Sequence, residues 1–123
     1  MRVFSTEAAL RRAANTLDLI AAAHAVGDVA LRDKRAVAGE VAVSQAQLTI
    51  IDGVLSAATH VFDALGASAT SQEIALDRHW RNARTLASHN PVAYKARILG
   101  DYLVNDTPPV SNIARLGRGG QGN

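Results

Sequence analysis

The stretch that decides the fold is LDRHWRNARTLASHNPVAYKARILGDYLVNDTPP, residues 76–109, because it contains two helical patterns separated by a sharp corner. It also holds the only Trp, both Tyr and all three Pro residues of the chain. Pro91 keeps Asn90 away from helical dihedral angles, so we expect one helix to end near Ser88 and another to follow. Asn90 would cap that following helix, with Pro91 at its first position.

Apolar residues at helical spacing give each of these two helices one inward face. The first helix is expected to start near Ser71, where Thr70 and Glu73 have the spacing of a capping box. Asp77 and Arg81 stand four residues apart with the acid first, which is the favourable order for a helical ion pair. The expected inward residues are Leu76, Trp80, Ala83 and Ala87 in the first helix, and Val92, Ala96, Leu99 and Leu103 in the second.

Two further helical patterns precede this stretch, joined by a tight connection at Gly27 and Asp28. Ser5 can cap the first of them. The second covers residues 36–65 and is the longest pattern in the chain. The residues on one face are Leu10, Ala14, Leu17, Ala21 and His24 in the first helix, and Val37, Val41, Ser44, Leu48, Ile51, Leu55, Ala58, Phe62 and Leu65 in the second.

The long helix is poor in charge, since Glu40, Asp52 and Asp63 are its only charged residues. A helix of this kind needs neighbours on more than one side. Polar residues interrupt it too often for a membrane span, which wants about 18 consecutive apolar residues. The predicted fold class is therefore all-α: an up-down four-helix bundle over residues 1–109 with the long helix at its centre, followed by a disordered tail over residues 110–123.

Composition supports a single helical domain and excludes several kinds of function. The 123 residues are 48% hydrophobic but only 4% aromatic, which suits closely packed helices better than a β-sandwich. The absence of cysteine excludes disulfides and thiolate chemistry. A net charge of only +2 without a basic block argues against a nucleic-acid partner. The N-terminus lacks the apolar core of a signal peptide, and we expect a cytoplasmic protein.

Two places in the sequence could carry chemistry, and each has a purely structural alternative. The small and hydroxyl residues from Gly66 to Ser71 precede a predicted helix, which suits an anion site, but plain capping explains them as well. Arg84 and the neighbouring Arg78 and Arg81 could bind a phosphate or form a solvated face. His89 stands at the predicted corner, where an imidazole can act as an acid–base group or cap the helix carbonyls. None of the four His has a partner at metal-ligand spacing.

The run from Leu76 to Thr85, followed by Ser88-His89-Asn90-Pro91, Tyr94-Lys95 and Gly100-Asp101-Tyr102, resembles the C-terminal domain of the acyl-CoA dehydrogenase superfamily. The similarity is to its flavin-dependent monooxygenase branch, which includes dibenzothiophene monooxygenases and sulfur-assimilation oxidoreductases. The preceding segment is similar to that family's Gly-Gly-Ala-Ser-Ala-Thr turn, with Leu65 in place of the first Gly. These motifs cover about residues 61–108.

The resemblance implies site residues by position. His89 corresponds to a histidine that faces the flavin ring and acts as, or supports, the acid–base group. The turn residues Gly66, Ser68, Thr70 and Ser71, together with Arg84, would bind the cofactor, which is FMN supplied in reduced form or FAD. Asn90 replaces an Asp that is common in the monooxygenases. Since family members are several times longer, the chain resembles a detached C-terminal domain, either a truncated reading frame or a fragment.

The function implied by the resemblance is that of a reduced-flavin-dependent monooxygenase acting on a sulfur-containing or aromatic substrate, with a separate flavin reductase as supplier. The parent enzyme is expected to be a homo-oligomer, a dimer or tetramer, that acts on a small molecule away from nucleic acid and membranes. Two alternatives stay open. One is a flavin-dependent acyl-CoA dehydrogenase, although no carboxylate base stands beside His89. The other is a non-catalytic helical assembly module.

Overall fold

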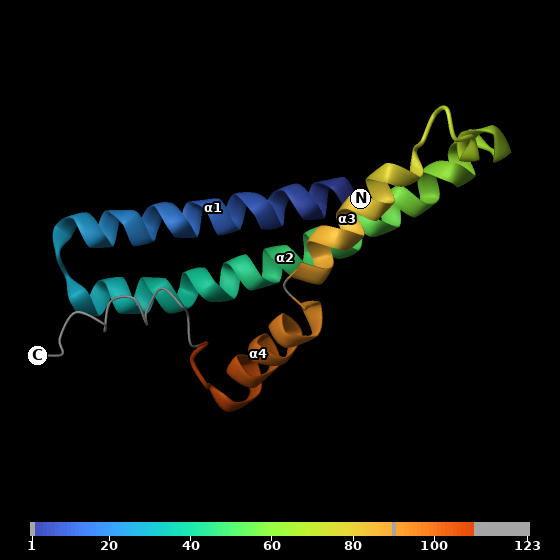
Figure 1. The fold of residues 1–123 in the computed structure, drawn as a ribbon. Coiled ribbons are helices and arrows are strands. Elements are labelled where there is room, and N and C mark those ends of the chain that lie inside the picture. Colours follow the sequence, from blue (N-terminus) through green and yellow to red (C-terminus); the bar gives the residue numbers. More distant parts are fainter. Residues whose placement is uncertain (1, 90, 110–123) are drawn as a thin grey trace, which may run out of the picture.

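The chain folds into four α-helices and one short 3₁₀ helix, which confirms the all-α class predicted from the sequence. In the computed structural model, residues 2–89 and 91–109 are described, and the tail predicted at 110–123 lies outside them. Helices α1 and α2 form a long antiparallel hairpin, α3 runs back beside the second half of α2, and α4 lies at an angle to α2 (Figure 1). The elements are α1 (Arg2–Val26), α2 (Val29–Leu65), η1 (Ala67–Thr70), α3 (Asp77–His89) and α4 (Val92–Asn105).

The tight connection predicted at Gly27 and Asp28 is confirmed, and the long helix begins directly after it at Val29, earlier than the apolar pattern that starts at residue 36. Gly27 has a φ of 75°, a conformation that glycine adopts without a steric penalty. Asp28 then caps α2: its side chain accepts a hydrogen bond of 2.9 Å from the backbone N–H of Leu31. Helix α1 also starts early, at Arg2, so the predicted cap at Ser5 is wrong.

The face of α1 that packs on α2 combines small residues with Ile20, and it does not contain the leucines that the periodicity favoured. Leu10 and Leu17 stay 56% and 48% exposed, while Ala13 and Ala23 are buried. On α2 the buried residues are Gly39, Ala42, Ser44 and Ala46. A Cβ at Gly39 would collide with Ile20 of α1, and one at Gly53 would lie 2.8 Å from Oγ1 of Thr6. Small side chains on both helices therefore allow the two backbones to approach closely.

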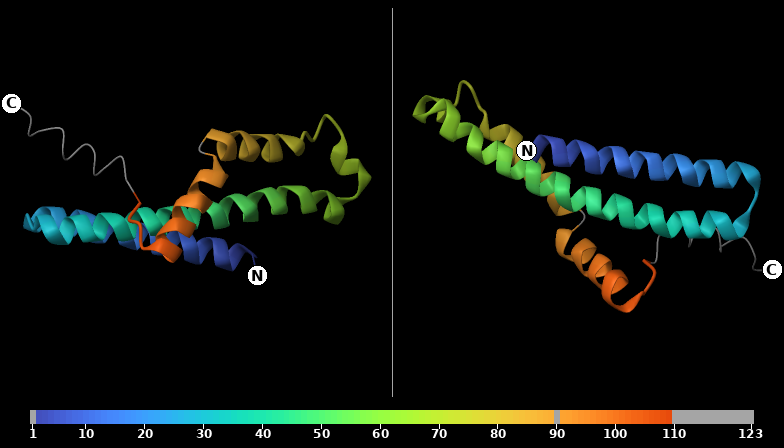
Figure 2. Two further views of the ribbon diagram at one scale, coloured as in Figure 1. Left: turned by 90° about the horizontal axis from the view of Figure 1, so that it is seen from below. Right: turned by 180° about the vertical axis from the view of Figure 1, so that it is seen from behind.

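Helix α2 has neighbours on more than one side, as its low charge predicted. Helix α1 lies along one face, while α3 and α4 lie against another (Figure 2). Eight of the nine predicted stripe positions are at least half-buried, Leu65 being the exposed one. An ion pair ties α4 to α2: Nζ of Lys95 lies 3.0 Å from Oε1 of Glu40, and both side chains are more than three-quarters buried.

The start of α3 differs from the prediction. The helix begins at Asp77, and the capping box expected at Thr70 and Glu73 does not start a helix. Instead, residues 67–70 form η1 and Ala75 takes a left-handed backbone conformation with a φ of 48°. A non-glycine residue in that region interrupts a helix, which explains the delayed start. The predicted ion pair is confirmed, since Arg81 Nη2 lies 3.3 Å from Asp77 Oδ2.

Helix α4 turns a different face inward from the one that its apolar residues suggested. Leu99 is buried and Val92 is half-buried, as expected, but Ala96 and Leu103 are exposed. Lys95, Ile98 and Tyr102 take the half-buried positions instead. The helix begins directly after Pro91, and Asn90, its predicted cap, lies outside the described residues. The pairing of Lys95 with Glu40 agrees with this rotation, since it needs the ammonium group to face α2.

By length and composition alone, α2 is apolar enough to cross a membrane, and it is the only such helix in the described part of the chain. Core helices of helical domains that are mostly buried pass the same test, whereas no residue in the most apolar window of α2 is fully buried. Three other helices pack along α2, and an ion pair with Glu40 joins one of them to it. These features fit a central helix.

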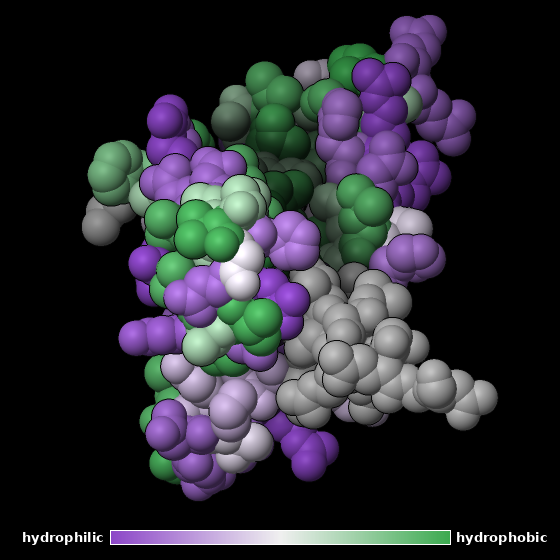
Figure 3. All heavy atoms as spheres, turned by 90° about the vertical axis from the view of Figure 1, so that its left-hand side faces the viewer, coloured by the Kyte–Doolittle hydropathy of each residue, from purple (hydrophilic) through white to green (hydrophobic). Residues whose placement is uncertain are grey.

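Many large apolar side chains remain on the surface. Figure 3 shows hydrophobic residues interspersed with polar ones on one face of the molecule, and hydrophobic residues line its hollow. In the described residues the buried apolar core consists of six alanines and Leu99. The exposed set is much bulkier and includes Val3, Phe4, Leu19, Val26, Leu86, Tyr94 and Val104. Such surfaces are typical of domains that pack against further protein.

The close α1–α2 contact leads to a stability prediction. Gly39→Leu should lower the free energy of unfolding by about 1–3 kcal/mol, because the new side chain displaces Ile20 and separates the hairpin. Gly100→Leu in α4 is the matched control, since no atom lies within 4 Å of its Cβ position. The control should be neutral or stabilising by up to about 1 kcal/mol through helix propensity. Urea unfolding followed by circular dichroism measures both, and equal effects would contradict the packing argument.

Candidate functional site

His89 is the last residue of α3, at the corner that the sequence predicted. Its side chain is exposed and makes no hydrogen bond or ion pair with another described residue. A carbonyl group near the end of the helix has another donor: Oγ of Ser88 donates to the carbonyl oxygen of Arg84 at 2.9 Å. In the described residues, His89 therefore does not cap the helix, and its ring nitrogens remain available to a ligand.

The turn between α2 and α3 presents hydroxyl groups around a short 3₁₀ helix. Gly66 ends α2 with a φ of 73°, and its N–H donates to the carbonyl of Phe62. Oγ1 of Thr70 donates to the carbonyl of Ala67 at 2.7 Å, so its proton is used within the turn. Oγ of Ser71 accepts a long hydrogen bond of 3.4 Å from Ile74 N–H. Ser68 is exposed, and its hydroxyl makes no hydrogen bond to the described residues.

Arg84 is separated from this turn. It lies in the second half of α3, whereas η1 lies at the far end of α2 (Figure 1). Arg84 instead lines a groove of about 590 Å³ that none of the four turn residues touches. The structure thus brings Gly66, Ser68, Thr70 and Ser71 together but does not bring Arg84 or His89 to them. Arg81, which pairs with Asp77, matches the solvated-face alternative.

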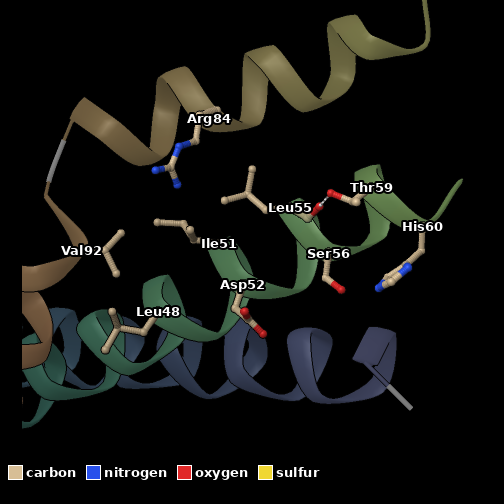
Figure 4. Close-up of a pocket in the computed structure, with 9 residues that line it drawn as sticks. All are labelled: Leu48, Ile51, Asp52, Leu55, Ser56, Thr59, His60, Arg84 and Val92. Atoms are coloured by element: carbon tan, nitrogen blue, oxygen red, sulfur yellow. Dashed lines mark hydrogen bonds between the residues drawn. The ribbon is translucent and has the colours of Figure 1, made fainter. Parts of the chain in front are cut away.

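The groove lies between α2 and the α3–α4 corner (Figure 4). Arg84 extends from α3 toward α2, and Val92 at the start of α4 closes the same end. His60 stands at the other end, where its Nδ1 lies 2.8 Å from Oδ2 of Asp63. The lining consists of Leu48, Ile51, Asp52, Leu55, Ser56, Thr59, His60, Arg84 and Val92.

The contribution of α2 to this groove was not predicted. Periodicity identified Leu48, Ile51 and Leu55 as core residues, and they form the apolar floor. The pairing of His60 with Asp63 could have been predicted from the sequence, because residues three apart on a helix share a face. The sequence could not show that α3 would bring an arginine over the same face.

Comparison with known proteins adds to this geometry. The family described as "Acyl-CoA dehydrogenase, C-terminal domain" matches residues 2–94, which contain α1, α2, α3 and the His89 corner. The chain belongs to this family. Its membership agrees with the all-α architecture and with the resemblance found in the motifs around His89.

Two monooxygenases are similar to this acyl-CoA dehydrogenase C-terminal domain over most of its length. The dibenzothiophene monooxygenase of Mycolicibacterium goodii is 33% identical over 108 residues, which is 86% of this chain. A probable FMNH2-dependent monooxygenase, SfnC, of Pseudomonas putida is 34% identical over 110 residues, or 85% of the chain. In each case the match covers 25% of the relative, so the chain spans about a quarter of their length. A dibenzothiophene monooxygenase of Rhodococcus erythropolis is 34% identical over 70 residues, covering 57% of this chain and 17% of the relative.

Proposed function

We propose that the chain serves as the C-terminal domain of a reduced-flavin-dependent monooxygenase that oxidises a sulfur-containing or aromatic small molecule. The observation that carries this proposal is the similarity to two monooxygenases over about 85% of the chain, in a match that includes the His89 corner. The name of one relative specifies FMNH2, which favours FMN over FAD. The reduced flavin, when bound, supplies the electrons that activate oxygen.

In this proposal His89 is the acid–base residue. Its imidazole lies at the end of α3, exposed and without a partner in the described part of the chain, and so is accessible to a ligand. Histidine is the side chain best suited to proton exchange near neutral pH. A ring nitrogen of His89 would accept or donate the proton while the oxidised substrate forms.

The cofactor phosphate is assigned to the turn. Gly66 admits close approach, since no atom lies within 4 Å of the position where a Cβ would stand. The exposed hydroxyl of Ser68 can donate to a phosphate oxygen, and so can that of Ser71, which only accepts in its bond with Ile74 N–H. Thr70 would first have to release its hydrogen bond to the carbonyl oxygen of Ala67. No Lys or Arg belongs to this segment, so the phosphate charge needs a cation from elsewhere in the assembly.

The exposed apolar surface supports assembly. We propose a homo-oligomer, a dimer or tetramer, in which the bulky exposed side chains of α1 and α4 contact other protein. A separate reductase would supply the flavin, and a cytoplasmic location would suit such an exchange. Neither nucleic acid nor a membrane is part of the proposal.

The acyl-CoA dehydrogenase alternative is less well supported by the residues themselves. Removal of an α-proton from an acyl thioester wants a carboxylate base. The sequence has no Asp or Glu between Arg78 and Gly100, the segment that contains the His89 corner. A non-catalytic assembly module remains the second alternative, and it is distinguished by whether the domain supports flavin chemistry.

A chimera tests the proposal directly. The matching quarter of the M. goodii dibenzothiophene monooxygenase is replaced with this chain, and oxidation of dibenzothiophene is measured with reduced FMN. We expect flavin-dependent oxidation, because the domain would supply both the acid–base residue and part of the phosphate site. An assembled chimera that binds FMN but only releases hydrogen peroxide would contradict the monooxygenase assignment. An assembled chimera without FMN affinity would favour the assembly module.

A further inference from the structure

The groove between α2 and the α3–α4 corner has an unusual combination of features for a surface depression. Its floor is aliphatic, formed by Leu48, Ile51 and Leu55, and Val92 closes one end. Its volume of about 590 Å³ falls within the range of small-molecule sites, about 300–1,000 Å³.

Arg84 places an unpaired cation over this floor. Figure 4 shows its guanidinium group extending from α3 toward Ile51 and Val92. It makes no hydrogen bond or ion pair with another described side chain, which is also true of Arg12, Arg35, Arg78 and Arg97. Arg84 remains exposed, so its attraction for an anion is screened by solvent and depends on a charge-assisted hydrogen bond formed beside the apolar floor.

The one carboxylate in the lining does not take this role. Asp52 points away from Arg84, toward α1 (Figure 4), and it has an interaction of its own. At the opposite end, Asp63 holds the imidazole of His60 at 2.8 Å. Ser56 lies between Asp52 and His60 in the sequence and also lines the groove. In Figure 4, Ser56 and His60 point the same way as Asp52, so no carboxylate of the lining faces the Arg84 guanidinium group.

We propose that this groove binds a small anion with a flat apolar body, such as an aryl sulfonate or aryl carboxylate. The anionic group pairs with Arg84, and the ring lies on Ile51 and Leu55. The site is separate from the turn assigned to the flavin phosphate, and it stands whether or not that assignment holds.

The test is a titration of the full chain, labelled at Ile, Leu and Val methyl groups, with naphthalene-2-sulfonate monitored by NMR. We expect saturable shifts concentrated on Leu48, Ile51, Leu55 and Val92. The neutral analogue naphthalene-2-methanol should bind the same methyl groups about twofold to fivefold more weakly. Arg84→Gln should weaken sulfonate binding about twofold to fivefold and leave the neutral analogue unchanged, as expected for loss of an exposed ion pair.

Controls separate this site from nonspecific binding. Arg81→Gln removes a neighbouring charge that is already paired, so it should leave sulfonate affinity unchanged. Raising the salt concentration should weaken the sulfonate but not the alcohol, which tests the charge without any substitution. Equal affinities for both probes, unchanged sulfonate binding in Arg84→Gln, or shifts spread over α1 would each overturn the proposal. Arg84 would then only cover apolar surface with its aliphatic stem.

Discussion

Replacing His89 with Ala in the chimeric monooxygenase should lower substrate oxidation by about 10²- to 10⁴-fold, the usual contribution of a general acid–base group. FMN affinity should change little, because the phosphate is assigned to the turn at the far end of α2. Hydrogen peroxide release should rise, since flavin oxidation would continue without productive proton exchange. Parallel measurement of oxidised substrate and peroxide gives the coupling ratio directly.

His79→Ala is the matched control for this prediction. His79 is an exposed histidine on the same helix, ten residues before His89, and it makes no hydrogen bond to another described side chain. Its loss should leave both products unchanged. If His89→Ala kept full coupling and lost only thermal stability, the imidazole would have a structural role and the mechanism would need another proton carrier.

Ser68→Asp should weaken FMN binding to the chimera by about a hundredfold or more, because it places a carboxylate where the phosphate is assigned. Like charges brought together at an interface cost several kcal/mol. Riboflavin, which lacks the phosphate, should bind the variant and the parent chimera about equally. Fluorescence titration with both flavins therefore separates a phosphate contact from general damage to the site.

Asn15→Asp provides the same added charge on the exposed surface of α1, away from the turn. It should affect neither flavin. Equal loss of FMN and riboflavin in Ser68→Asp would mean that the turn shapes the domain without contacting phosphate. Unchanged FMN binding would remove the turn from the cofactor site, while leaving the monooxygenase assignment to the His89 result.

Periodicity predicted the number of helices and the central one, because apolar spacing reflects burial along a long helix. It failed for the orientation of α1, where large leucines stay outside and Ala13 and Ala23 pack inward. Hydrophobicity alone cannot recognise an interface selected for small size. The rotation of α4 was missed for a related reason, since it depends on Lys95 pairing with a residue 55 positions earlier.

The candidate site was predicted only in part. A pre-proline bend identified the His89 corner, and glycine with hydroxyl residues identified the turn. Local signals of this kind lie within a few residues of one another. The groove at Arg84 joins residues from α2, α3 and α4, and helical patterns do not specify how far one helix is rotated against another.

The arrangement of three helices around α2 also affects how the protein can change over evolutionary time. Helices α1 and α4 each pack mainly on α2, one along each side. Substitutions in α1 and α4 that do not share a neighbour should combine additively in their effects on stability, so each helix can diverge without compensation in the other. A substitution in the middle of α2 affects its contacts with α1 and with α3 and α4. Mutational tolerance should therefore be lowest around Gly39–Ala46, where α2 buries its smallest side chains.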